Sequence, residues 1–144
     1  MKTKFLSILA LTLAMAIAGC DDDDDNQDNI MNFSATLSGA NEVPANASTA
    51  TGTATATYNE TTNRLSISVP YSGMTATAAH IHLGEPGVSG PPVFPFSSLT
   101  SPLTLTNVEL TDAQEDDLLS GMYYVNIHSE AFPGGEIRGQ LTED

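Results

Sequence analysis

YYVNIHSEAFPGGEIRGQL, residues 123–141, carries the clearest structural signal in the chain. Residues 123–128 alternate between apolar and polar side chains, which is the two-residue period of a strand with two different faces. Residues 133–135, Pro-Gly-Gly, supply the backbone freedom of a tight reversal, and residues 136–141 alternate again. The stretch predicts a β-hairpin with one apolar face and one face that carries His, Asn, Glu, Arg and Gln.

The chain upstream of this hairpin alternates in the same way. A turn cluster at residues 59–63 predicts a hairpin between the strands on either side of it. Strands are predicted over residues 33–37, 50–58, 65–71, 78–83, 93–96 and 103–108. Many short strands separated by turns are typical of an antiparallel β-sandwich or barrel.

One short helix is predicted directly before the hairpin. Thr111 and Gln114 have the spacing of a capping box, in which the Thr side chain caps the third helical amide and the Gln side chain reaches back. Leu118 and Leu119 give this helix an apolar side, and Gly121 is a natural stop. The expected fold is therefore all-β with one short helix.

The first 20 residues, Met1–Cys20, are expected to be a secretory signal. Two lysines precede an apolar run that is too short to span a membrane comfortably, and small residues stand directly before Cys20. This order resembles the bacterial lipobox, in which the cysteine is lipidated; the alternative is a signal peptide with a chance cysteine at its end. Residues 21–30, which begin with five aspartates, are expected to be a solvated tether. The folded domain is placed at residues 31–144.

The charge of the chain limits its partners. The formal net charge is −14, and from Asp21 onward two arginines stand against 18 acidic residues, which gives −16 for that part. Nucleic acid and anionic lipid surfaces repel such a chain, so nucleic-acid binding is not expected. A single cysteine excludes an internal disulfide.

Four ordered motifs resemble one known family, the CHRD domain, which is named for chordin and also occurs in bacterial secreted proteins. The motifs are LSGANEVP at residues 37–44, AHIH at 79–82, YVNIH at 124–128 and PGGEIRGQL at 133–141. The resemblance covers residues 33–141. It implies an immunoglobulin-like β-barrel that is distantly similar to copper/zinc superoxide dismutases, and it implies no established biochemical activity.

The three histidines are candidate metal ligands. His80 and His82 project from the same face of one predicted strand, and His128 lies on another, so together they have the donors of a mononuclear copper or zinc site. The dismutase likeness favours this interpretation, but three histidines cannot supply a dinuclear site, so dismutase activity is not expected. The competing interpretation is a hydrogen-bonded polar network that defines the fold and to which Asn126, Glu136, Arg138 and Gln140 also belong.

The sequence thus predicts a bacterial lipoprotein, anchored through Cys20 in the outer membrane and exposed either to the periplasm or at the cell surface. We expect its CHRD-like domain to act as a non-catalytic binding or structural module with a protein or small-molecule partner that the residues do not identify. The alternative function is binding of one copper or zinc ion through three histidines. No complete set of catalytic residues is recognised, so an enzymatic activity is left open without an assignment.

Overall fold

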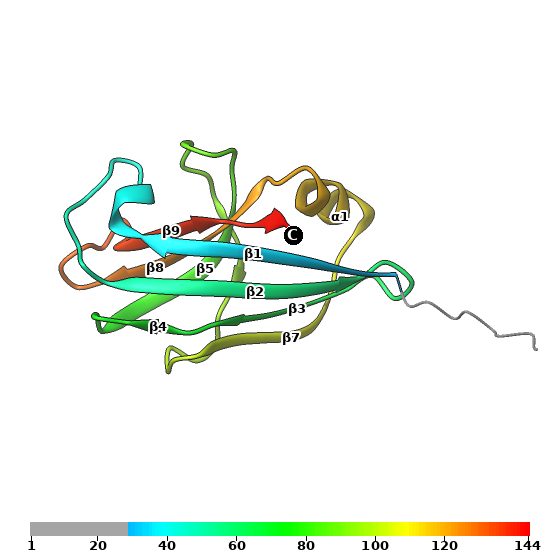
Figure 1. Ribbon diagram of the computed structural model, residues 1–144, viewed down its shortest axis with the longest axis horizontal. Coiled ribbons are helices and arrows are strands. Elements are labelled where there is room, and N and C mark those ends of the chain that lie inside the picture. The colour runs from blue at the N-terminus through cyan, green and yellow to red at the C-terminus, as the bar shows by residue number, and fades with distance from the viewer. Residues whose placement is uncertain (1–28) are drawn as a thin grey trace, which may run out of the picture.

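The computed structural model describes residues 29–144 (Figure 1). The predicted signal peptide, the lipidation site Cys20 and all but the end of the acidic tether lie outside the described residues. The first strand begins at Ile30, one residue before the expected start of the domain. No helix in the described part of the chain is long and apolar enough to cross a membrane.

The prediction of an all-β fold with one short helix is confirmed. The elements are β1 (Ile30–Ser38), the 3₁₀ turn η1 (Gly39–Asn41), β2 (Thr51–Asn59), β3 (Arg64–Val69), β4 (Tyr71–Ser72), β5 (Ala76–Leu83), β6 (Pro92–Pro95), β7 (Leu103–Glu109), α1 (Asp112–Leu119), β8 (Tyr123–Ser129), β9 (Ile137–Gln140) and β10 (Thr142–Glu143).

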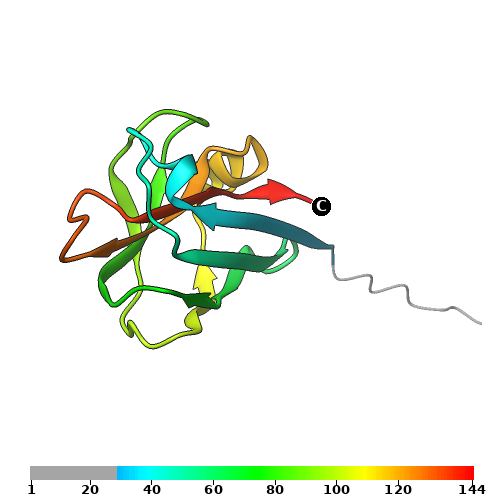
Figure 2. The same cartoon turned by 60° about the vertical axis from the view of Figure 1, so that its left-hand side comes forward.

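All strand pairs are antiparallel and belong to one sheet, in the order β6-β5-β8-β9-β1-β2-β3-β7. Two short strands lie off this path, since β10 pairs with β1 and β4 pairs with β2. The sheet curls, so that β5 and β8 pass behind β1 and β2 in Figure 1, and Figure 2 shows the same curl from the side. Side chains from both halves of the sheet meet in one apolar core.

The β2–β3 hairpin shows how the alternating sequence produces this core. Exposed threonines of β2 alternate with buried Gly52, Ala54, Ala56 and Tyr58 along the strand. The register places Thr57 opposite Ser66 and Tyr58 opposite Leu65, so small hydroxyl side chains share the outer face and apolar side chains share the inner face. The predicted hairpin is therefore confirmed.

The capping box of the single helix is also confirmed. The Thr111 hydroxyl accepts a hydrogen bond from the Gln114 amide at 3.3 Å, and the Gln114 side-chain oxygen accepts from the Thr111 amide at 3.0 Å. Of the two apolar residues near the helix end, Leu118 is buried and Leu119 is exposed. Gly121 follows with a φ of +68°, a conformation that glycine adopts without strain.

The C-terminal hairpin is formed by β8 and β9, and β5 pairs with the other edge of β8. Its apolar face is ordinary core: Val125 and Ile127 of β8 and Ile137 of β9 are fully buried, as is Ile81 of β5. Burying a side chain of this size contributes about 2 kcal/mol to folding. This core fixes the register of the three strands, and the register in turn fixes which side chains meet on the opposite face.

Candidate metal centre

The second face of β5, β8 and β9 brings the polar residues of the three strands together. The register aligns His82 with Tyr124 and Tyr124 with Gln140, and it aligns His80 with Asn126 and Asn126 with Arg138. His128 lies opposite Ala78, next to His80. We call this the imidazole face; it comprises His80, His82, Tyr124, Asn126, His128, Arg138 and Gln140, with Glu136 directly before β9.

Loops cover most of the imidazole face. Asn126 and Arg138 are each 3% exposed. The loop that follows β5 lies over them: Gln140 donates a hydrogen bond to the Gly84 carbonyl at 3.0 Å, and Arg138 donates to the Glu85 carbonyl at 3.1 Å. The polar side of the hairpin is therefore a largely buried layer, in which backbone carbonyls of this loop hold the Arg138 and Gln140 side chains.

The chain around η1 completes this layer on its other side. The Asn126 side chain donates to the Glu42 carboxylate at 2.7 Å, and the Ser48 hydroxyl donates to the Glu136 carboxylate at 2.6 Å. Asn46 donates to the Glu136 carbonyl at 3.1 Å. Burial raises the pKa of the Glu42 carboxyl, and the hydrogen bond from Asn126 opposes that rise.

The three histidines form a compact cluster within this face. Their ring centroids are 5.4 Å apart for His80 and His128, 5.5 Å for His80 and His82, and 5.9 Å for His82 and His128. One nitrogen from each ring lies within 4.8 Å of the others. His82 is the most deeply buried, whereas His80 and His128 are half-exposed, so the cluster opens toward solvent on one side.

Backbone carbonyls fix the orientation of two of the rings. Nδ1 of His82 lies 2.9 Å from the Gly90 carbonyl oxygen, and Nδ1 of His128 lies 3.0 Å from the Pro133 carbonyl oxygen. A carbonyl only accepts hydrogen bonds, so each Nδ1 carries the proton, and in the neutral imidazole Nε2 then carries a free lone pair. This arrangement is the one that proteins use to orient metal-bound histidines.

Three imidazole nitrogens are left without a partner, and on His82 and His128 the carbonyl contacts show that this nitrogen carries a lone pair. Nε2 of His82, Nε2 of His128 and Nδ1 of His80 are all buried, and none makes a hydrogen bond. Burial lowers the pKa of both His80 and His82, and neighbouring imidazoles lower it further, which favours the neutral rings. For His82 the bond to Gly90 opposes this shift. Buried nitrogens of this kind need a partner, either a water molecule or a bound ion.

The geometry is close to that of a three-nitrogen metal site. Nitrogens bound to one zinc ion at ~2.0–2.1 Å lie ~3.4 Å apart in a tetrahedral arrangement. The histidine nitrogens lie within 4.8 Å of one another, so ring movements on the order of 1 Å would bring them to metal-binding distance. The donor set therefore fits one ion of the copper or zinc type.

Tyr124 and Gly90 take part in this cluster, and no motif of the sequence indicated a role for either of them. The Tyr124 ring stacks on His82, with centroids 5.0 Å apart and planes 17° apart, and its hydroxyl accepts from the Gly90 amide at 3.0 Å. A Cβ on Gly90 would lie 1.6 Å from the Leu83 carbonyl oxygen. The alternation of β8 already placed Tyr124 on the polar face, but nothing in the sequence placed the loop residue Gly90 beside it.

The Glu42–Asn126 pair was likewise not anticipated. Glu42 belongs to the LSGANEVP motif, but a contact with Asn126 spans 84 positions, and no local pattern predicts such a distant pairing.

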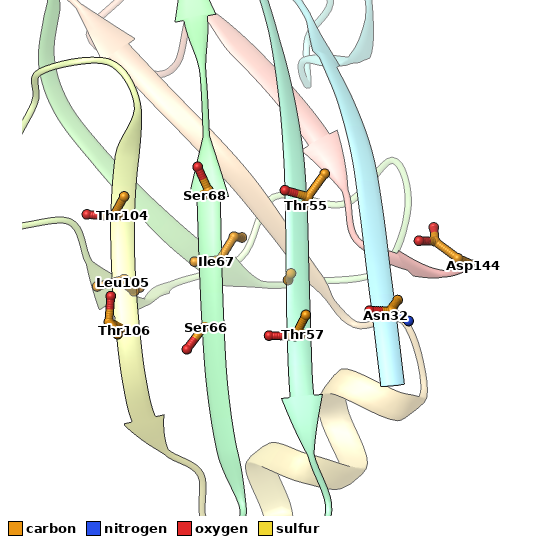
Figure 3. A pocket seen from close by; sticks show the side chains of 11 residues that line it. Asn32, Thr55, Thr57, Ser66, Ile67, Ser68, Thr104, Leu105, Thr106 and Asp144 are labelled. Atoms are coloured by element: carbon orange, nitrogen blue, oxygen red, sulfur yellow. The ribbon is translucent and has the colours of Figure 1, made fainter. Parts of the chain in front are cut away.

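A second polar face lies on β1, β2, β3 and β7, away from the histidines. It forms a shallow hollow of about 490 Å³ lined mainly by small hydroxyl side chains (Figure 3). We call it the hydroxyl face; its polar lining residues are Asn32, Thr55, Thr57, Ser66, Ser68, Thr104, Thr106 and Asp144. This lining includes only one titratable residue, Asp144 at its edge, so it offers little for acid–base or metal chemistry.

Comparison with known proteins connects this structure to one family. Residues 33–141, more than half of the chain, match the family model of the CHRD domain. No curated protein and no solved structure matches the chain.

Proposed function

The chain belongs to the CHRD domain family, as its four motifs indicated, and on that premise we propose that it is a metal-binding module of the bacterial cell envelope. The proposed ligand is a single copper or zinc ion, held by His80, His82 and His128. This proposal takes the alternative function of the sequence, binding of one copper or zinc ion, in place of the non-catalytic binding or structural module expected first.

The observation that carries the proposal is the set of three unpartnered imidazole nitrogens. A polar network that served only the fold would satisfy its own members, as Asn46, Ser48 and Gln140 do. The histidine nitrogens instead converge without partners, while carbonyls hold the far side of two of the rings. Lone pairs that are oriented and left free favour a metal ligand set over a structural network.

The half-exposed side of the cluster suggests an open coordination position. Structural zinc sites are usually closed by four protein ligands, whereas three ligands leave a place for water or another small ligand. His80 and His128 border the solvent, so an exchangeable ligand would enter there. A bound ion would supply Lewis-acid or, for copper, redox chemistry at this position.

The lipid anchor is proposed on separate grounds. Charge, apolar length, small residues and Cys20 follow one another in the order of a lipoprotein signal. We propose that Cys20 anchors the protein in the outer membrane and that the acidic stretch behind it acts as a spacer, facing the periplasm or the cell surface. Incorporation of a labelled fatty acid that disappears in Cys20→Ala would support this; labelling that persists would contradict it.

Metal analysis of the purified protein tests the proposed centre. The chain from Cys20 onward, with Cys20→Ser and without an affinity tag, is loaded with copper or zinc and freed of excess ion. We expect one equivalent of metal per chain, and its loss in His82→Gln. Thr55→Ala on the hydroxyl face is the control and should keep the full equivalent. Failure to retain stoichiometric metal, or equal retention in His82→Gln, would overturn the proposal.

A further inference from the structure

Resting on the proposed metal site, we infer that the centre favours copper in its lower oxidation state, Cu(I), because Arg138 holds a buried positive charge behind His82 that no carboxylate contacts. Three side chains, those of His82, Tyr124 and Arg138, form a stack. The Tyr124 ring lies against His82, and the guanidinium carbon of Arg138 lies 3.5 Å from the centre of the Tyr124 ring. A cation at this distance from an aromatic face is held by the ring's electrons.

Arg138 has no acidic partner in direct contact. Its side chain donates to the Glu85 carbonyl at 3.1 Å and to the Gln140 side-chain oxygen at 3.3 Å, and both acceptors are neutral. In the part of the chain that the structure describes, the single ion pair joins Arg64 to Glu109 at the surface. The guanidinium therefore keeps its full charge in a site that is 3% exposed.

The acidic residues around the imidazole face do not cancel this charge by contact. Glu42 accepts its hydrogen bond from Asn126 and attracts Arg138 through space, which offsets part of the positive charge, but its carboxyl group is buried and burial raises its pKa. Glu136 accepts from Ser48. Glu85 meets Arg138 through its backbone carbonyl, and the residue itself is exposed.

The donor set gives the metal no negative charge either. Three neutral imidazoles leave Cu(I) with a charge of one and Cu(II) with a charge of two, so the guanidinium repels Cu(II) about twice as strongly. Burial weakens the screening by water, so the stronger repulsion of Cu(II) persists at the position of the metal. Across the rings of Tyr124 and His82 we expect this repulsion to shift the ratio of the two affinities on the order of tenfold.

The experiment compares the affinities of the two copper ions in matched variants of the Cys20→Ser chain. Cu(I) is titrated without oxygen against a chromophoric chelator, and Cu(II) is titrated against a second chelator. Relative to the parent chain, Arg138→Met should lower the Cu(I)-to-Cu(II) affinity ratio on the order of tenfold. Arg138→Lys, which keeps the charge, should stay close to the parent ratio.

A second variant guards against a failure of Arg138→Met to fold. Gln140→Glu places a carboxylate beside Arg138 but gives up the amide's hydrogen bonds to the Gly84 and Gly121 carbonyls. Once circular dichroism shows that this variant is folded, it should lower the ratio in the same direction. Copper binding with an unchanged ratio in a folded variant overturns this inference and leaves the metal site standing. A parent chain that binds neither copper nor zinc overturns both the inference and the proposed function.

Discussion

The imidazole face and the hydroxyl face are built by the same alternation but end in opposite environments. On β2 the polar positions are exposed and the apolar positions are buried, as a sheet with one wet side requires. On β8 six of seven residues are buried, so both faces of that strand are covered. The difference arises from the loops around η1 and after β5, which fold over the imidazole face and leave the hydroxyl face open.

This contrast shows that a polar face becomes a site when other parts of the chain close over it. The threonines of the hydroxyl face on β2 are exposed, so water can reach their hydroxyls, and the Ser66 hydroxyl accepts from the Asn107 amide at 3.0 Å. The side chains of the imidazole face lie out of the solvent, so every donor and acceptor needs a partner within the protein or a ligand. Only the histidine nitrogens, together with Asn126 Oδ1 on this face, lack one.

The largest effect on stability and metal binding is expected at Gly90, in the loop that packs tightly against the imidazole face. Gly90→Ala would push a methyl group to within 1.6 Å of the Leu83 carbonyl oxygen, so the loop must shift and release His82. We expect a loss of about 3 kcal/mol in the free energy of unfolding, with weaker copper and zinc binding. Urea denaturation measures the first effect and metal titration the second.

Gly134→Ala is the matched control for this substitution. It lies beside Pro133 in the loop that holds His128, and a Cβ there meets nothing within 4 Å. Its stability and metal binding should stay near those of the parent chain. Equal losses in the two variants would mean that the Gly90 loop does not position the centre.

A smaller effect is expected from removing one polar group on each face. Asn126→Ala removes the donor to Glu42 and leaves a buried carboxyl group without that partner, which should cost about 2 kcal/mol. Thr55→Ala removes an exposed hydroxyl and should stay within about 0.5 kcal/mol of the parent. Similar urea midpoints for the two variants would contradict the difference drawn between the faces.

The smallest effect at neutral pH concerns Tyr123, whose ring lies on the core side of β8. Its hydroxyl is buried without a partner, so Tyr123→Phe should change the stability at pH 7 by no more than about 0.5 kcal/mol. Burial raises the pKa of Tyr123 to about 12. The pKa of Tyr123 in the folded protein lies above the unfolded value of 10.0. The stability that the protonated phenol contributes is therefore complete below pH 10 and is lost as the pH rises toward 12.

Alkaline titration measures the raised pKa of Tyr123 directly. Tyr58 on β2 also has a pKa raised to about 12, mainly by burial, so two phenols should ionise late in the near-ultraviolet absorbance. Tyr123→Phe should remove one of these two late steps and flatten the loss of stability above pH 10. Two late steps in the variant would show that Tyr123 is not the group responsible.

The sequence predicted the local features of this fold well because local physics determines them. The period of two identified the strands, and the Thr111–Gln114 spacing identified the helix start, since both signals lie within a few residues. The same period put Tyr124, Asn126 and His128 on one face, and the motifs indicated the family.

The contacts that give the imidazole face its character could not be predicted in this way. Glu42 and Asn126 are 84 positions apart, and Tyr124 and Gly90 are 34 apart. Such pairs depend on how the sheet curls and where the loops return, and neither property has a local signature. The unpartnered nitrogens of His82 and His128 become evident only once the carbonyls of Gly90 and Pro133 are in place.

The short strand β6 has a consequence for how neighbouring molecules meet. It forms one end of the sheet, next to the strand that carries His80 and His82, and the end of a sheet is where another chain adds a strand. β6 begins at Pro92 and ends at Pro95, and proline has no backbone N–H to offer a new partner. This edge therefore discourages self-association, and crowded copies of the protein should keep the histidine cluster uncovered.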